Sequence, residues 1–119
     1  MLVLVVLAIV SINAQERPWT NGILTNPVAN TVLAQFPGAD ADHYNIRYSF
    51  VVCSTAAAIV IVEKRDVANA VIWSQAYTVG ANDCREPPQR IFPFAVGDYI
   101  AVKLNAGITG KIQSTIFQE

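Results

Sequence analysis

YNIRYSFVV, from Tyr44 to Val52, is the stretch of this sequence that decides the fold. Every second residue in it is large and apolar, and the polar residues Asn45, Arg47 and Ser49 stand between them. Successive side chains of a β-strand point to opposite faces, so this alternation predicts a strand that is buried on one face and solvated on the other. No long segment of the chain shows a helical period, and we therefore expect an all-β fold.

Further short strands follow at regular intervals along the chain, and the one over residues 56–65 is apolar on both faces up to Glu63, which predicts a central place in its sheet. Turn signals such as Pro37-Gly38 and Gly97-Asp98 separate them. The expected strands cover residues 28–36, 44–52, 56–65, 70–79, 90–94, 98–105 and 111–118. This pattern predicts an antiparallel, jelly-roll-like β-sandwich of about seven strands, in a domain that spans residues 28–119.

The alternation also predicts which side chains fill the core of the sandwich. Residues at every second position of a strand share one face, and the apolar face must be the buried one. The predicted core residues are Ile46, Tyr48, Phe50, Val60, Val62, Trp73, Ile100, Val102 and Leu104.

An unbroken apolar run, MLVLVVLAIV, begins the chain at Met1. A secretory signal peptide has an apolar segment of about 7–15 residues before a small-residue cleavage site, and Ala14 before Gln15 would suit such a site. No Lys or Arg precedes the run, so we interpret it instead as part of the working protein. A membrane-spanning helix needs about 20 apolar residues, and polar residues from Ser11 onward end this run too early for a membrane span.

β-Branched residues dominate the run and favour a strand, both faces of which would be apolar. We expect residues 1–14 to form a donor-type strand that inserts into a neighbouring copy, with residues 15–27 as its linker. The expected subunit-interface residues are Leu2, Val3, Leu4, Val5, Val6, Leu7, Ile9, Val10 and Ile12. Two alternatives stay open: the run folds back on its own domain, or residues 15–27 are an ordered loop of the sandwich.

The composition narrows the classes of partner and activity. Hydrophobic residues make up 53% of the chain and charged residues 14%, against a usual charged share of about 25%. The net charge of -1 offers no basic patch for nucleic acid. The sequence contains no HExxH, GxSxG, P-loop, CxxC or dinucleotide-binding motif, so we expect neither an enzyme nor a cofactor.

Cys53 and Cys84 are the two cysteines of the chain. Their spacing matches no metal motif, and one histidine leaves a zinc site short of ligands. An even count in a chain expected to be extracellular predicts a disulfide bond between them. Two buried thiols are the alternative, because cysteine is readily buried without pairing.

Two further groups of residues have a functional and a structural interpretation. Asp40, Asp42 and His43 could chelate a cation, but two carboxylates fall short of the 6–8 oxygen ligands of calcium, so we expect a solvated turn and no metal site. Tyr44, Tyr48, Trp73 and Tyr77 could line a carbohydrate-binding face, but alternating aromatic residues on strands are more often part of a core.

Four stretches carry a family resemblance. They are NTVLA (Asn30 to Ala34), YNIR (Tyr44 to Arg47), the segment from Glu63 to Gln75, and AGITGKIQSTIF (Ala106 to Phe117). Over these stretches the chain resembles small β-sandwich proteins of phage and environmental bacterial sequences, some of which are virion-associated. More loosely, it resembles subunits of extracellular nanofilaments in which an N-terminal strand completes a neighbour's sandwich. The first resemblance does not include the N-terminal run.

These observations together predict a structural subunit of an extracellular or cell-surface filament, a helical homopolymer whose partners are copies of itself. The apolar run and the low charged share are both explained by such an assembly. The alternative functions are a phage virion decoration or fibre protein, located on the virion, and a carbohydrate-binding surface module. A binding module would instead present an exposed aromatic platform.

Overall fold

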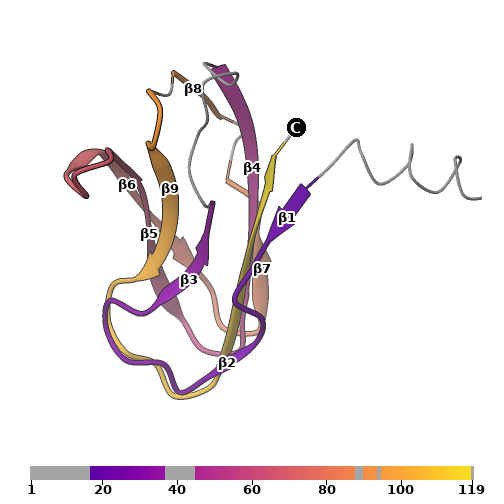
Figure 1. Cartoon of the computed structure of the whole chain (residues 1–119). Helices are drawn as coiled ribbons and strands as arrows, with labels where there is room; N and C mark the ends of the chain where they lie inside the picture. The colour runs from indigo at the N-terminus through magenta and orange to yellow at the C-terminus, as the bar shows by residue number, and fades with distance from the viewer. Residues whose placement is uncertain (1–16, 37–44, 88–89, 94, 119) are drawn as a thin grey trace, which may run out of the picture.

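Two antiparallel β-sheets stacked face to face make up the described part of the molecule (Figure 1). The computed structural model describes residues 17–36, 45–87, 90–93 and 95–118 of the 119-residue chain. Within these ranges there are ten strands and no helix, so the predicted all-β sandwich is confirmed.

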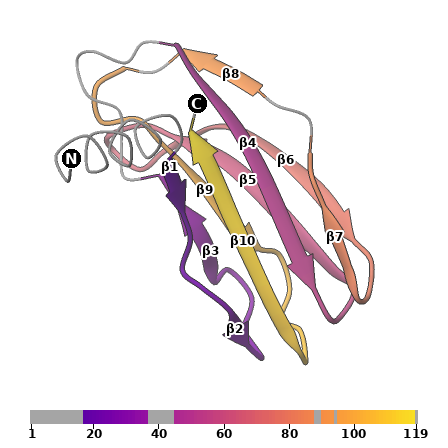
Figure 2. The same ribbon diagram turned by 90° about the vertical axis from the view of Figure 1, so that its right-hand side faces the viewer.

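The first sheet, sheet A, is built around β4 (Asn45–Ser54) and β10 (Lys111–Gln118), which pair with each other. Its strand order is β1-β10-β4-β7, and in addition β2 pairs with β10 and β8 with β4. The short strands are β1 (Arg17–Trp19), β2 (Leu24–Thr25), β7 (Asp83–Arg85) and β8 (Arg90–Pro93). Figure 2 looks onto sheet A, with β1 and β2 at one side and β7 at the other.

The second sheet, sheet B, has the strand order β3-β9-β5-β6. Its strands are β3 (Val32–Gln35), β9 (Tyr99–Leu104), β5 (Ala58–Arg65) and β6 (Val71–Val79). β5 pairs with β9 on one side and with β6 on the other, which confirms the central place that its apolar sequence predicts. β6 ends the sheet, on the side of the molecule away from β1 (Figure 2).

Each of the seven predicted strands has a counterpart in the structure, but the first begins later than expected. β3 starts at Val32, because the preceding residues form a turn. The backbone N–H and the hydroxyl of Thr31 both donate to the Val28 carbonyl, at 3.3 and 2.7 Å. Asn30 has a φ of 65°, a left-handed conformation that asparagine tolerates and an extended strand does not contain.

The segment predicted as a linker belongs to the sandwich from Arg17 onward. β1 and β2 both pair with β10, with Trp19 opposite Ile116 and Leu24 opposite Ile112. Trp19 and Leu24 also pack against the core. Residues 17–27 are therefore part of the domain, and the rest of the predicted linker, residues 15 and 16, lies outside the described ranges.

The inner faces of the two sheets form the hydrophobic core. The predicted core residues that are buried are Tyr48, Phe50, Val60, Val62, Ile100, Val102 and Leu104. Trp73 is half-buried and packs against this core, and the side chain of Ile46 lies outside what the structure describes. The ring of Phe36 contacts Tyr48 and Trp19 edge to face, with ring centres 5.3 and 4.9 Å away, and so joins β3 to β4 and β1.

Alkaline pH should destabilise the fold through Tyr48. Burial raises the pKa of its phenol above the ordinary value, so above about pH 10 the unfolded chain releases this proton and the native protein keeps it. The free energy of unfolding then falls by about 1.4 kcal/mol per pH unit from this group. Urea unfolding between pH 8 and pH 11, run on wild type and on Tyr48→Phe, measures this effect. Equal slopes for the two proteins would contradict it.

Candidate assembly surface

An unpaired strand edge presents free N–H and C=O groups, and natural sheets usually cover, shorten or charge their edges. The outer edge of β10 is covered by β1 and β2. Between these two strands, the hydroxyl of Thr20 donates to the Ser114 carbonyl at 2.7 Å. Sheet A is therefore protected on this side.

The outer edge of β3 is also protected. The Asn21 backbone N–H donates to the Leu33 carbonyl at 3.1 Å, and the Asn21 side-chain amide donates to the Val32 carbonyl at 2.7 Å. A tight turn holds Asn21 in place, with Gly22 at a φ of 79° and its N–H bonded to the Thr20 hydroxyl at 3.0 Å. On the far side of sheet A, β7 and β8 are only three and four residues long, too short to serve as a long template.

β6 is the long edge that the described residues leave open. Its nine residues, VIWSQAYTV, include no charged residue, proline or glycine. Val71 and Ile72 expose 47% and 53% of their surface, and Ile59 on the adjoining β5 exposes 44%. An edge that is long and uncharged, with exposed apolar side chains at one end, is a site where another strand can add.

The hydrogen-bond pattern fixes which backbone groups β6 turns outward. Residues of an antiparallel pair alternate between bonding the partner strand and facing away from it. The Ile59 carbonyl accepts a bond from the Asn105 N–H, at 2.9 Å, so Ile59 and its opposite residue Thr78 face away from each other. Ser74 and Ala76 have the same phase as Thr78. We call the outward N–H and C=O groups of Ser74, Ala76 and Thr78 the β6 edge.

Arg85 closes one end of the β6 edge. Its guanidinium donates to the Thr78 carbonyl at 2.9 Å and lies 5.4 Å from the centre of the Tyr77 ring. Because Arg85 ends β7, this contact ties the last residues of β6 to sheet A. The open part of the edge therefore comprises the groups of Ser74 and Ala76 and the N–H of Thr78.

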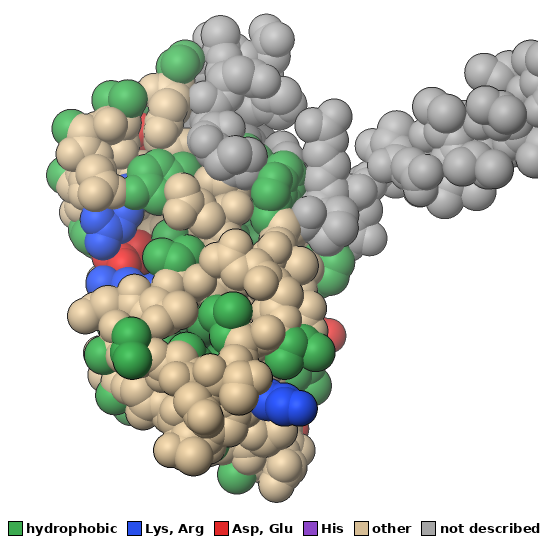
Figure 3. All heavy atoms as spheres, turned by 60° about the horizontal axis from the view of Figure 1, so that its bottom comes forward, with side chains coloured by type: hydrophobic (Ala, Val, Ile, Leu, Met, Phe, Trp, Pro, Cys, Tyr) green, Lys and Arg blue, Asp and Glu red, His purple; other side chains and the backbone are tan. Residues whose placement is uncertain are grey.

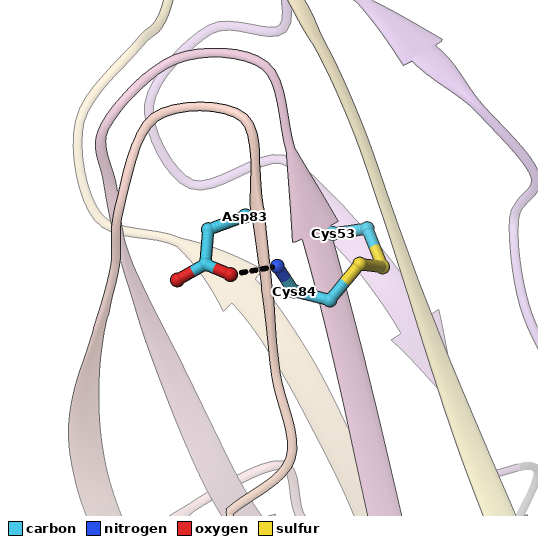
Figure 4. The surroundings of a disulfide bond; sticks show 3 residues. All are labelled: Cys53, Asp83 and Cys84. Atoms are coloured by element: carbon cyan, nitrogen blue, oxygen red, sulfur yellow. Dashed lines mark hydrogen bonds between the residues drawn. A yellow bond between two sulfur atoms is a disulfide. The ribbon is translucent and has the colours of Figure 1, made fainter.

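The predicted disulfide between Cys53 and Cys84 is confirmed (Figure 4). The two residues lie directly opposite each other on β4 and β7, and their Cα atoms are 4.0 Å apart. The side chain of Asp83 accepts a hydrogen bond from the Cys84 N–H at 2.8 Å. The bond fixes β7, which pairs with β4 through three residues only, and so positions Arg85 beside β6.

A polar hollow of about 270 Å³ lies on the outer face of sheet B. Glu63, 3% exposed, forms ion pairs there with Lys103 at 2.9 Å and Arg65 at 3.0 Å. The other lining side chains include Asn30, Gln35, Asn69 and Tyr99. Figure 3 shows an acidic group between basic ones on a face that otherwise carries few charges. The carboxylate is neutralised by its two neighbours, and the amides leave donors and acceptors for a small polar ligand.

The structure describes the placement of some of the remaining candidate site residues and not of others. The expected interface residues from Leu2 to Ile12, the cluster Asp40, Asp42 and His43, and Tyr44 lie outside the described residues. Tyr48 and Tyr77 are buried, which places them in the core and not on a carbohydrate-binding platform.

The described residues offer neither a metal cluster nor a membrane-spanning helix. In the ranges given above, no group of three or more His, Cys, Asp or Glu side chains could hold a metal ion. Over the same part of the chain, no helix has the length and apolarity needed to cross a membrane.

Sequence reasoning did not find the β6 edge or the role of Arg85. Strand order within a sheet depends on pairing between distant segments, which local alternation does not show. The charge pattern was no guide either, because residues 56–65, which end in Glu63, Lys64 and Arg65, are paired on both sides, and the uncharged residues 70–79 end the sheet.

The chain matches no family model and no curated protein. Among solved structures it is similar to an arabinose-bound α-L-arabinofuranosidase, MgGH51, with a TM-score of 0.50 and 11% sequence identity. The similarity covers 91% of this chain and 24% of that one, so the chain spans about a quarter of that protein's length. At this identity the likeness concerns the β-sandwich fold alone.

Proposed function

We propose that this protein is a structural subunit of an extracellular homopolymer, in which each subunit gives its N-terminal strand to a neighbour. The observation that carries the proposal is the open β6 edge, an uncharged strand of nine residues at the end of sheet B. The chain thus combines an acceptor with an N-terminal segment, residues 1–14, whose apolar run favours a strand. The donor segment precedes β1 in sheet A and the acceptor is β6 in sheet B, and such heterologous contacts form open filaments when the rotation between subunits does not close.

An extracellular location is supported by the disulfide and by the small share of charged residues. Disulfides persist in oxidising compartments. A charged share of 14% is well below the usual value of about 25%, and burial between subunits would remove part of the apolar surface from water. Exposed Ile23, Val28 and Val96, at 66%, 71% and 63%, show how much apolar surface a lone copy presents.

Deleting residues 1–14 tests the proposal. The full-length protein should form filaments under negative stain and sediment at high speed, while the truncated protein should stay monomeric, because it keeps the acceptor but lacks the donor. Circular dichroism and a free-thiol assay on the truncated protein check that the sandwich and its disulfide are intact.

Two results would overturn the proposal. One is a truncated protein that still forms the same filaments. The other is a working protein whose intact mass shows that the chain starts at Gln15, because the run would then be a removed leader.

A carbohydrate-binding module is the second candidate, and the polar hollow around Glu63 favours it. The hollow offers amide and ammonium donors from Asn30, Gln35 and Lys103 beside the Tyr99 ring. Tyr48 and Tyr77 do not contribute a binding platform, because both are buried. Binding on a glycan array that Lys103→Ala and Gln35→Ala abolish would support this function.

A further inference from the structure

We infer that the β6 edge is the acceptor for the donated strand, and that Arg85 marks the end of the bound segment. This inference rests on the proposed function and names the site at which it occurs. The occupant is the segment from Leu2 to Ile12 of a second copy of this chain. The donor's main chain would bond Ser74, Ala76 and the Thr78 N–H, the groups that β6 turns outward.

The first argument is the state of the other edges. β10 is covered by β1, β2 and the Thr20 hydroxyl, and β3 by Asn21. β7 and β8 are too short to pair with a long donor. β6, with nine residues, is the described edge long enough to pair with part of the donor segment, through the open groups from Ser74 to Thr78.

The second argument is that the donor is apolar on both faces. A strand added beyond β6 places alternate side chains on the two sides of sheet B. On the outer side it would lie next to Ser74, Ala76 and Thr78, of which Ala76 is apolar, with Ile59, 44% exposed, one strand further in. On the inner side it would lie beside half-buried Trp73 and extend the core. The inner environment therefore requires an apolar donor face, and the outer one adds a contact with Ile59.

The third argument is reach. β1 and β6 lie on opposite sides of the molecule (Figure 2). β1 ends sheet A and β6 ends sheet B. Three strand spacings of about 4.8 Å and a sheet separation of about 10 Å put these two strands about 17 Å apart, measured along a straight line through the core. From Ile12 to Arg17 the chain makes five residue steps and spans at most about 18 Å when extended, which barely equals this straight line and leaves nothing for a path around the outside of the core. The strand of a neighbouring copy does not have to pass around the core of the acceptor subunit to reach β6. The geometry therefore favours donation between subunits over insertion of a subunit's own strand.

Arg85 gives the acceptor a defined end. Its bond to the Thr78 carbonyl, at 2.9 Å, occupies the group that a longer donor would need. A donor strand on β6 would therefore pair with Ser74 and Ala76 and stop at Thr78. Because the donor strand ends at Thr78, its register against β6 is fixed. An edge without such an end would leave the register undefined.

Proline at position 76 tests the acceptor without breaking the sandwich. The Ala76 N–H points away from β5, so Ala76→Pro removes an outward donor and no bond of the β5–β6 ladder. Ala76→Val is the matched control, because it keeps the N–H and suits a strand. In the full-length protein, we expect Ala76→Pro to abolish sedimentable filaments and Ala76→Val to assemble like wild type. If Ala76→Pro fails to fold, Ser74→Pro removes an equivalent outward N–H.

Mixing experiments separate a blocked acceptor from a damaged fold. A full-length Ala76→Pro subunit still carries the donor, and the protein truncated by residues 1–14 still carries the acceptor. Mixed together, the two should form a one-to-one heterodimer that size-exclusion chromatography with light scattering detects. Two copies of either variant alone should stay monomeric.

The outcomes distinguish this inference from the proposed function. If truncation abolishes filaments but Ala76→Pro assembles like wild type, the acceptor lies elsewhere and this inference is wrong, while strand donation stands. A mixture that gives no heterodimer also overturns the β6 site. If the full-length protein is a stable monomer, the strand either occupies its own β6 edge or none, and both proposals are wrong.

Discussion

Phe50→Ala is expected to lower the free energy of unfolding by about 3–5 kcal/mol. Phe50 lies on the inner face of β4 with 3% of its surface exposed, and its ring stacks on Tyr48 with centres 6.3 Å apart. Its truncation removes buried apolar surface and leaves a cavity between the sheets, because close-packed neighbours relax only in part. Urea unfolding of the protein truncated by residues 1–14, followed by circular dichroism, measures the change without interference from assembly.

Ser49→Ala is the matched control for this substitution. Ser49 precedes Phe50 on the same strand and faces the outer side of sheet A, where it is half-buried. Substitutions away from core and network positions usually change stability by less than about 0.5 kcal/mol. A loss below about 1 kcal/mol for Phe50→Ala would mean that the assigned inner face of β4 is wrong.

Local pattern was sufficient to predict the long strands, because a period of two over six to ten residues has no helical counterpart. β4, β6, β9 and β10 follow this period, β5 is instead a continuous apolar run, and the apolar positions of these five strands form most of the core. β1, β2 and β7 contain two or three residues each, too few for a period to appear. β1 also contains Pro18, which argued against a strand at that point, although proline is tolerated on edge strands.

The candidate site was less predictable than the fold, because it depends on which strand ends each sheet. Residues 56–65, which contain β5, and residues 70–79, which contain β6, are both rich in apolar residues. Neither sequence indicates that β5 is paired on both sides and β6 on one side only. Similarly, Arg85 reaches β6 only because the chain crosses from sheet B to sheet A after Val79. The cysteines were predictable, since their even number limited the pairing to one choice.

Replacing both cysteines, as Cys53→Ala with Cys84→Ala, is expected to lower the free energy of unfolding by about 3–4 kcal/mol in the chain-entropy model. The bond joins residues separated by 31 positions, so its loss returns the freedom of that loop to the unfolded chain. Urea unfolding of the oxidised wild type and of the double variant, both without residues 1–14, gives the difference.

Reductant supplies the internal control for the disulfide. It should lower the stability of the wild type to that of the double variant and leave the variant unchanged. β7 should respond most strongly, because beyond the disulfide it is held to β4 by three residue pairs only. Hydrogen exchange at Cys84 and Arg85 should therefore accelerate on reduction. If stability and exchange are the same with and without the bond, the disulfide does not hold β7 in place, and the position of Arg85 over the Thr78 carbonyl must depend on its contacts with β6 alone.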